Sequence, residues 1–102
     1  EIIYRAKKLQ EMGAVNVLVS MAERGAILLD KQCRVHRCGV CRGQVRNSVG
    51  AGDSMVAGFL AGLESGSLEY ALKLGTAAGG ATAFSDGLAE RNKIYELLGQ
   101  LP

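Results

Sequence analysis

Aromatic residues and proline are scarce in this sequence. Its 102 residues include no tryptophan, one proline, three tyrosines and two phenylalanines. We therefore expect an interior built from Val, Leu, Ile and Ala. The 14 glycines stand beside a 48% share of apolar residues. Because so apolar a chain is unlike a disordered one, the glycines indicate close backbone approaches rather than disorder.

An excess of charge of one sign is also lacking. The sequence has twelve basic and ten acidic residues, which gives a net charge of +2. The basic residues are scattered, apart from a mild cluster between Arg34 and Arg46. Binding to nucleic acid requires a concentrated basic face. We therefore expect no nucleic-acid partner.

Long hydrophobic runs are missing as well. No apolar run approaches the roughly 20 residues that cross a bilayer, and no secretory signal peptide opens the chain. We expect no membrane partner and a cytoplasmic location. The chain has a length suited to one domain at most. It opens directly on a helical pattern with no initiator Met, so we expect it to be a piece of a longer protein.

The hydrophobic patterns predict an α/β protein. Apolar runs at 15–19 and 26–29 predict two strands, the first of them buried and parallel to its neighbours. Weaker alternation over 33–37 predicts an edge strand, and Val45 marks the end of another. Helical spacing predicts four helices, at 2–12, 53–64, 67–84 and 90–98. Gly13 ends the first of them, and Ser67 caps the third.

All three cysteines and the only histidine lie within nine residues, at Cys33, His36, Cys38 and Cys41. Three thiolates and one imidazole have the chemistry of a tetrahedral zinc site, and Cys38 and Cys41 have the C-x-x-C spacing of redox dithiols. However, structural zinc sites usually join two separated knuckles, and an edge strand points Cys33 and His36 to opposite faces. We expect cysteines without a metal, with zinc and redox roles as the alternatives.

The run NSVGAGDSMVAG, residues 47–58, places two glycines and a carboxylate before an apolar helix. Gly50 and Gly52 allow unusual backbone angles and let a ligand lie against bare amides. The helix that follows offers unpaired N–H groups and the positive end of its dipole. These features together predict an anion site. The site suits a phosphoryl group in transfer, because its oxygens carry the charge.

Asp53 stands at the start of that helix, where the dipole favours its ionised form. A carboxylate beside an anion site repels phosphate alone, but it has a role when a hydroxyl lies between the two. Asp53 would then accept the hydroxyl proton as the oxygen attacks a γ-phosphate. The alternative is an Asp that only complements the dipole. Walker A and dinucleotide motifs do not fit, because no Lys follows and Met55 replaces the third glycine.

Two small faces follow along the predicted helices. One consists of Ala57, Gly58, Ala61 and Gly62, and the other spans residues 76–81. Small side chains let two helices approach closely, and close packing is the expected role. The alternative is a wall flat enough for an adenine ring.

These stretches resemble a known family. Residues 47–58 look like the second signature of the ribokinase-like (PfkB) carbohydrate kinases. Within that family, VGAGDSMVAGF and GTAAGGATAFSDGLA are most similar to the 1-phosphofructokinases, with the tagatose-6-phosphate kinases as close relatives. The resemblance spans essentially the whole chain. It implies the carboxyl-terminal part of a three-layer α/β/α sandwich, with residues 1–102 as the nucleotide-binding and catalytic-base segment of the kinase domain.

The resemblance also implies a reaction. The intact protein would phosphorylate fructose 1-phosphate to fructose 1,6-bisphosphate, with ATP and Mg²⁺ as cofactors. Asp53 would contact the substrate and take the proton from its C6 hydroxyl. The anion hole would consist of Gly50, Ala51, Gly52 and the amide of Asp53.

The family's nucleotide turn has its counterpart in residues 20–25. The resemblance implies ATP binding at Ser20, Met21, Ala22, Glu23, Arg24, Gly25, Gly52 and Asp53. Ala22 stands where the family usually has glycine. The loop at 85–87 would border the adenine pocket. The resemblance implies no metal in the cysteine stretch.

Several parts of such a kinase would lie upstream of this chain. They include most of the sugar-binding residues, the β-sheet lid and the Asn/Glu motif that organises Mg²⁺. We therefore expect no sugar kinase activity from the segment alone, and a homodimer of the full-length protein stays open. The rival interpretation is a non-catalytic fragment that binds nucleotide or zinc.

Overall fold

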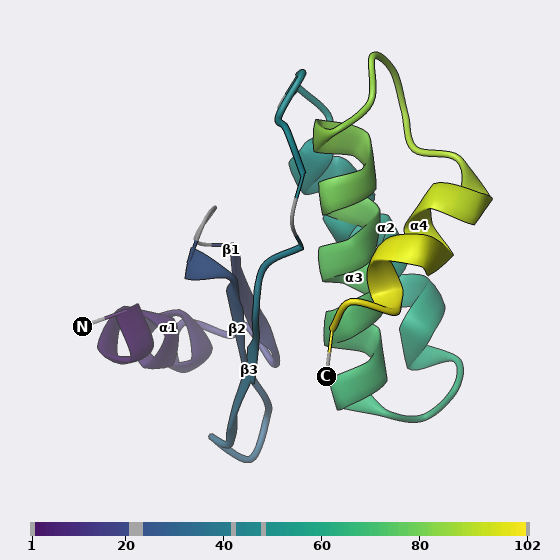
Figure 1. Cartoon of the computed structure of the whole chain (residues 1–102). Coiled ribbons are helices and arrows are strands. Elements are labelled where there is room, and N and C mark those ends of the chain that lie inside the picture. Colours follow the sequence, from purple (N-terminus) through teal and green to yellow (C-terminus); the bar gives the residue numbers. More distant parts are fainter. Residues whose placement is uncertain (1, 21–23, 42, 48, 102) are drawn as a thin grey trace.

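The fold has three layers. The computed structural model describes residues 2–20, 24–41, 43–47 and 49–101. Figure 1 shows a helix on one face of a small sheet and three helices on the other face. The elements are, in chain order, α1 (Ile2–Glu11), β1 (Val17–Ser20), β2 (Ala26–Leu29), β3 (Val35–Cys38), α2 (Ala51–Leu63), α3 (Leu68–Ala83) and α4 (Arg91–Leu98). The α/β class expected from the sequence is confirmed, and so is the order of elements apart from the strand that was expected to end at Val45.

The sheet is antiparallel, and the expectation of a parallel first strand is wrong. Strand β2 lies in the centre and pairs with β1 from Val17↔Leu29 to Ser20↔Ala26. Strand β3 pairs with the other edge of β2. The connections at 21–25 and 30–34 are too short for a parallel crossover, which needs a dozen residues or more. All four residues of β2 are buried. A strand that is covered on both faces is apolar along its whole length whether its neighbours are parallel or antiparallel, so the apolar pattern does not reveal the orientation.

The two faces of the sheet belong to different hydrophobic clusters. The face toward the helical layer contributes Ala26 and Leu28, which pack with Met55, Phe59, Ala71 and Leu72 of α2 and α3. The opposite face contributes Val17 and Leu29, which pack on Ala6 of α1. Because side chains alternate along a strand, β2 contacts both layers and fixes the sheet between them.

The helix ends follow local side-chain chemistry. Helix α1 ends at Glu11, and Gly13 takes a φ of 120°. Ser67 caps α3, because its hydroxyl accepts the Tyr70 N–H at 3.1 Å. Both helix ends agree with those predicted from the sequence. Helix α2 begins at Ala51, two residues earlier than predicted, so Gly52 belongs to its first turn.

Helices α2 and α3 pack with their backbones in direct contact. A Cβ at Gly62 would lie 2.6 Å from the Cα of Ala71, and a Cβ at Gly75 would lie 2.8 Å from the Met55 carbonyl oxygen. No side chain fits at either position without a shift of the backbone. The two predicted small faces also meet, because a Cβ at Gly58 would lie 2.9 Å from the Cβ of Ala78. Their expected close packing is therefore confirmed. Among the described helices, none has the length and apolar character to cross a bilayer.

Candidate functional site

A cavity of about 600 Å³ lies between one end of the sheet and the helices α2 and α3. Four parts of the chain form its walls. Ser20 and Gly25 come from the two ends of the β1–β2 connection, and Ala51 and Gly52 from the first turn of α2. The other two parts are the segment after β3 and helix α3 with its end, which contribute Val40, Cys41, Gly43 and Val45, and Thr76, Gly79, Gly80, Ala83 and Phe84. A cavity of this size is typical of a site for a small molecule.

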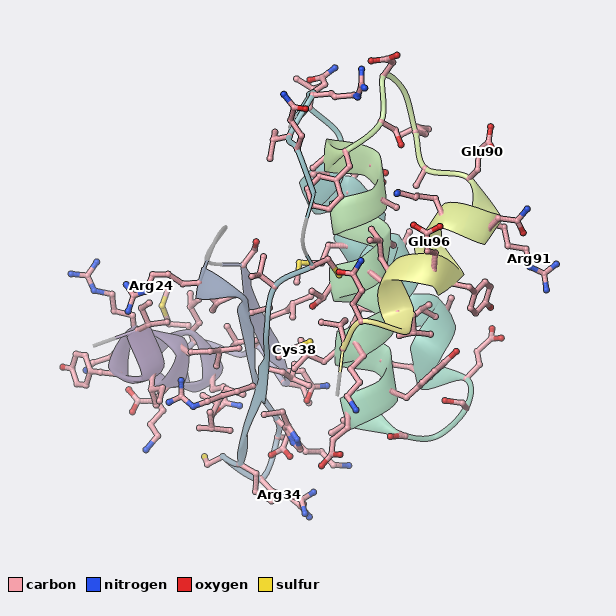
Figure 2. The ribbon with its side chains drawn as sticks, in the orientation of Figure 1. Arg24, Arg34, Cys38, Glu90, Arg91 and Glu96 are labelled. Atoms are coloured by element: carbon pink, nitrogen blue, oxygen red, sulfur yellow. The ribbon has the colours of Figure 1, made fainter. Side chains whose placement is uncertain are left out.

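The structure brings together part of the predicted nucleotide site. Ser20, Gly25 and Gly52 line the same cavity, although Gly52 is far from the other two in the sequence. Arg24 is exposed and is not among the lining residues, and Figure 2 shows it on the α1 side of the sheet. The predicted contacts at Met21, Ala22 and Glu23 lie outside the described residues.

The start of α2 has the geometry of an anion site. Gly50 precedes the helix with φ 86° and ψ −9°, a left-handed conformation that glycine adopts without strain. The first helical hydrogen bond runs from the Ser54 N–H to the Gly50 carbonyl at 2.9 Å. The N–H groups of Ala51, Gly52 and Asp53 therefore have no acceptor within the helix. No side chain caps this end, so three amides can face a ligand.

Asp53 is exposed in the first turn of α2, one residue after the cavity-lining Gly52. Within the described part of the chain, its carboxylate has neither an ion pair nor a side-chain hydrogen bond. An accessible carboxylate next to three N–H groups can accept a proton from a hydroxyl while those groups hold an anion.

Helix α3 has two faces with different contacts. Ala77, Ala78 and Ala81 are buried against neighbouring helices, whereas Gly79 and Gly80 line the cavity. Gly79 is also closely packed, because a Cβ there would lie 3.1 Å from the Ala51 carbonyl oxygen. Close packing is therefore confirmed for this helix, and the wall for an adenine ring stays a prediction.

The sequence did not point to Phe84 as a cavity residue. Its ring lies against the backbone of Gly43, where an added Cβ would meet the ring at 2.5 Å. Val40, Cys41 and Val45 line the same wall. No strand forms at Val45 in the described residues, because the N–H groups of Arg46 and the next residue donate to the Ala83 carbonyl instead. These positions become neighbours only in the fold.

The cysteines and the histidine do not converge. Cys33 lies near Gln10, with 3.6 Å from its sulfur to Oε1, whereas the Cys41 sulfur lies 3.7 Å from the Leu97 carbonyl oxygen. Figure 2 shows Cys38 between the sheet and the helical layer. The described residues contain no group of three or more metal-ligating side chains. The structure gives the zinc alternative no donor set.

The redox alternative is also not favoured. Cys41 is buried, and this burial raises the pKa of its thiol, with a smaller contribution from Cys38. A raised pKa keeps the thiol protonated at neutral pH, whereas reactive cysteines need the thiolate.

His36 has a structural partner that the sequence did not reveal. The Asp30 carboxylate is only 1% exposed and lies 2.9 Å from the His36 Nε2. It also accepts the N–H groups of Gln32 and Arg34, each at 2.9 Å, and the Arg34 Nε at 3.0 Å. These contacts, led by His36, hold the pKa of Asp30 well below its ordinary 3.8, although burial alone raises it. Figure 2 shows Arg34 at the end of the sheet away from the cavity.

The Asp30 cluster makes acid stability testable. Its pKa is lowered in the folded state, so the stabilisation is complete above the ordinary value of 3.8. It is lost as the pH falls below that value, because the unfolded state then binds one proton more than the folded state. We expect Asp30→Asn to be less stable at neutral pH and to lose this part of the acid dependence. Urea unfolding at a series of pH values measures both effects.

Asp86 provides the matched control for this experiment. Its carboxylate is 90% exposed and lies 3.7 Å from Arg46, a surface contact of little consequence for stability. Asp86→Asn should keep the wild-type acid dependence. Equal slopes for Asp30→Asn and the wild type below pH 3.8 would contradict the assignment.

Comparison with known proteins places this geometry in context. The chain matches the description "pfkB family carbohydrate kinase" over residues 1–94. It is 48% identical over 99 residues to the 1-phosphofructokinase of Bacillus subtilis. This alignment covers 96% of this chain and 32% of that protein. It is 40% identical over 102 residues to the D-tagatose-1-phosphate kinase of Bacillus licheniformis, which covers 99% of this chain and 33% of that protein. The chain thus spans about a third of the length of these relatives.

Solved structures have the same arrangement of elements. Phosphofructokinase-2 from Escherichia coli, in complex with substrates and products, superposes with a TM-score of 0.86 at 26% identity. The match covers 97% of this chain and 33% of that one. Ribokinase from Arabidopsis thaliana, complexed with ribose and ATP, superposes with a TM-score of 0.84 at 25% identity. The match covers 95% of this chain and 33% of that one. The ribokinase-like architecture expected from the sequence is confirmed.

Proposed function

This chain belongs to the pfkB family of carbohydrate kinases, and from that premise we propose that it forms the nucleotide-binding and catalytic-base segment of an ATP-dependent sugar-phosphate kinase. The substrate that we propose for the intact protein is fructose 1-phosphate, with fructose 1,6-bisphosphate as the product. The observation that carries the proposal is the shared cavity. It joins Ser20 and Gly25 to the amide-rich start of α2, with Asp53 beside it.

The proposed reaction is a direct transfer. Asp53 accepts the proton of the sugar hydroxyl while the hydroxyl oxygen forms a bond to the γ-phosphorus of ATP. The bond between the γ-phosphorus and the bridging oxygen breaks, and ADP leaves with that electron pair. The N–H groups of Ala51, Gly52 and Asp53 donate to the oxygens of the transferred group and stabilise their charge.

The described residues fit the two cofactors differently. The cavity and the free amides suit a nucleotide and its phosphates. For Mg²⁺, the described part of the chain offers no cluster of three acidic or imidazole ligands. Its ligands are therefore proposed to come from ATP and from parts of the intact protein outside this chain, and no step above passes through the metal.

The choice of sugar rests on sequence similarity. The relative from B. subtilis is named a 1-phosphofructokinase, and its identity is 48% against 40% for the D-tagatose-1-phosphate kinase. The alternative suggested by the sequence was a tagatose-6-phosphate kinase. The tagatose kinase found among the relatives is instead named for tagatose 1-phosphate. The difference in identity favours fructose 1-phosphate.

A substrate panel on the intact protein tests the proposal. We expect the highest kcat/KM with fructose 1-phosphate, compared with tagatose 1-phosphate, tagatose 6-phosphate and fructose 6-phosphate. A higher kcat/KM with a tagatose phosphate would assign the protein to that branch. Nucleotide binding without turnover of any sugar phosphate would favour the rival non-catalytic module. The 102-residue chain alone is proposed to be inactive, and ATP turnover by it that depends on fructose 1-phosphate would contradict this.

A further inference from the structure

Thr82 connects three segments of the chain beside the candidate site through one side chain. It lies in the last turn of α3 and is 1% exposed. Its hydroxyl lies 2.7 Å from the Ser54 hydroxyl in the first turn of α2. It also accepts the Ala89 N–H at 3.1 Å. Its methyl group lies 3.8 Å from the point where a Cβ on Gly50 would stand.

The hydroxyl, rather than the shape, distinguishes this residue from valine. Both are β-branched with similar helix propensity. A buried hydroxyl is unfavourable unless it is hydrogen-bonded, and the two contacts of Thr82 satisfy it. The choice of threonine is therefore explained by the connection to Ser54 and Ala89.

The neighbouring backbone holds the other end of the same turn. The Ala83 carbonyl accepts the N–H groups of Arg46 at 2.8 Å and Asn47 at 3.1 Å. Residues 46 and 47 lead into the glycine turn, and Ser54 follows Asp53. The end of α3 thus fixes both sides of the segment that contains Gly50, Gly52 and Asp53.

We propose that Thr82 is a positioning residue for phosphoryl transfer, which rests on the function proposed above. Its bond to Ser54 fixes the first turn of α2, and with it the Asp53 carboxylate and the three free amides. Its bond to Ala89 connects that turn to the chain two residues after the loop at 85–87. Catalysis depends on this placement, because displacement of a reacting group by about 1 Å costs about a hundredfold in rate.

The test uses conservative variants of the intact kinase. Thr82→Val should lower kcat by roughly ten- to a hundredfold, with KM for both substrates nearly unchanged, because the lost interaction acts in the transition state. Thr82→Ser retains the hydroxyl and should recover most of the wild-type kcat. Ser54→Ala removes only the Ser54 contact, so its loss of kcat should be no larger than that of Thr82→Val, which also removes the Ala89 contact. The double variant should be no slower than Thr82→Val, because the two changes share the Ser54 contact.

Two further measurements separate positioning from general stability. Ser65→Ala removes a hydroxyl that donates to the Gly62 carbonyl near the other end of α2, and it should leave kcat unchanged. Hydrogen exchange of the Ser54 amide, which donates to the Gly50 carbonyl, should be faster in Thr82→Val than in the wild type. If Thr82→Val does not fold, Ser54→Ala tests the same contact at a half-buried position.

Each outcome decides the proposal. A loss of kcat that Thr82→Ser does not recover, or an additive double variant, would contradict it. Faster exchange with an unchanged kcat would also contradict it. If the wild-type protein has no kinase activity, the proposed function fails. Exchange of the Ser54 amide then decides separately whether Thr82 holds the turn.

Discussion

Asp53→Asn is expected to lower the kcat of the intact kinase by roughly 10²- to 10⁴-fold, the usual contribution of a general base. Asparagine keeps the size and the backbone N–H of Asp53, but its amide cannot accept the hydroxyl proton. The carboxylate is exposed in the first turn of α2 and has no competing partner among the described side chains, so the change should not disturb the fold. A coupled assay of ADP release measures kcat.

The same variant separates a kinase from a binding module. Its Kd for ATP, measured by calorimetry, should stay close to the wild-type value. The control is Glu64→Gln, an exposed carboxylate at the other end of the same helix, which should keep full activity. An Asp53→Asn protein with wild-type kcat would remove the residue from the mechanism.

Gly52→Ala is expected to separate stability from activity. Gly52 lies inside α2, and a Cβ built there meets no atom within 4 Å. Alanine is favoured over glycine in a helix by about 1 kcal/mol, so the melting temperature should stay equal or rise. The same position lines the cavity beside the free amides. A methyl group there keeps a phosphate away from the N–H groups, and kcat/KM should fall by about 10²-fold or more, as when an oxyanion-hole donor is lost.

Gly39→Ala is the matched control for this variant. A Cβ at Gly39 also meets no atom within 4 Å, and Gly39 does not line the cavity. It should change kcat/KM little. Thermal unfolding and steady-state kinetics on the three proteins give both quantities. Equal kcat/KM in the Gly52 and Gly39 variants would show that bare backbone at residue 52 is not needed.

The sequence predicted features that depend on near neighbours in the chain. Ser67 caps α3 and Gly13 follows α1, because both effects involve residues within one helical turn. The glycine turn ahead of α2 was predicted for the same reason, and Gly50 has the positive φ that the pattern required. The residues 20–25 and the start of α2 were connected only through the family resemblance.

The features that the sequence did not predict depend on contacts between elements rather than within one helix or turn. The run at 15–19 contains no signal for strand orientation, which follows from the short connections on both sides of β2. His36 was considered a zinc ligand because it stands among the cysteines in the chain, whereas its partner is Asp30, six residues earlier, which the fold buries. Phe84 became a cavity residue only when Gly43 packed against it.

The contact at Gly62 and Gly75 has a consequence for ligand entry. With backbone against backbone, α2 cannot slide or rotate on α3 without a steric clash. The amides of the first turn of α2 and the glycine wall of α3 therefore move as one rigid body. Any adjustment to the size of an incoming molecule then falls to the other walls, which are the ends of β1 and β2 and the segment from Val40 to Val45.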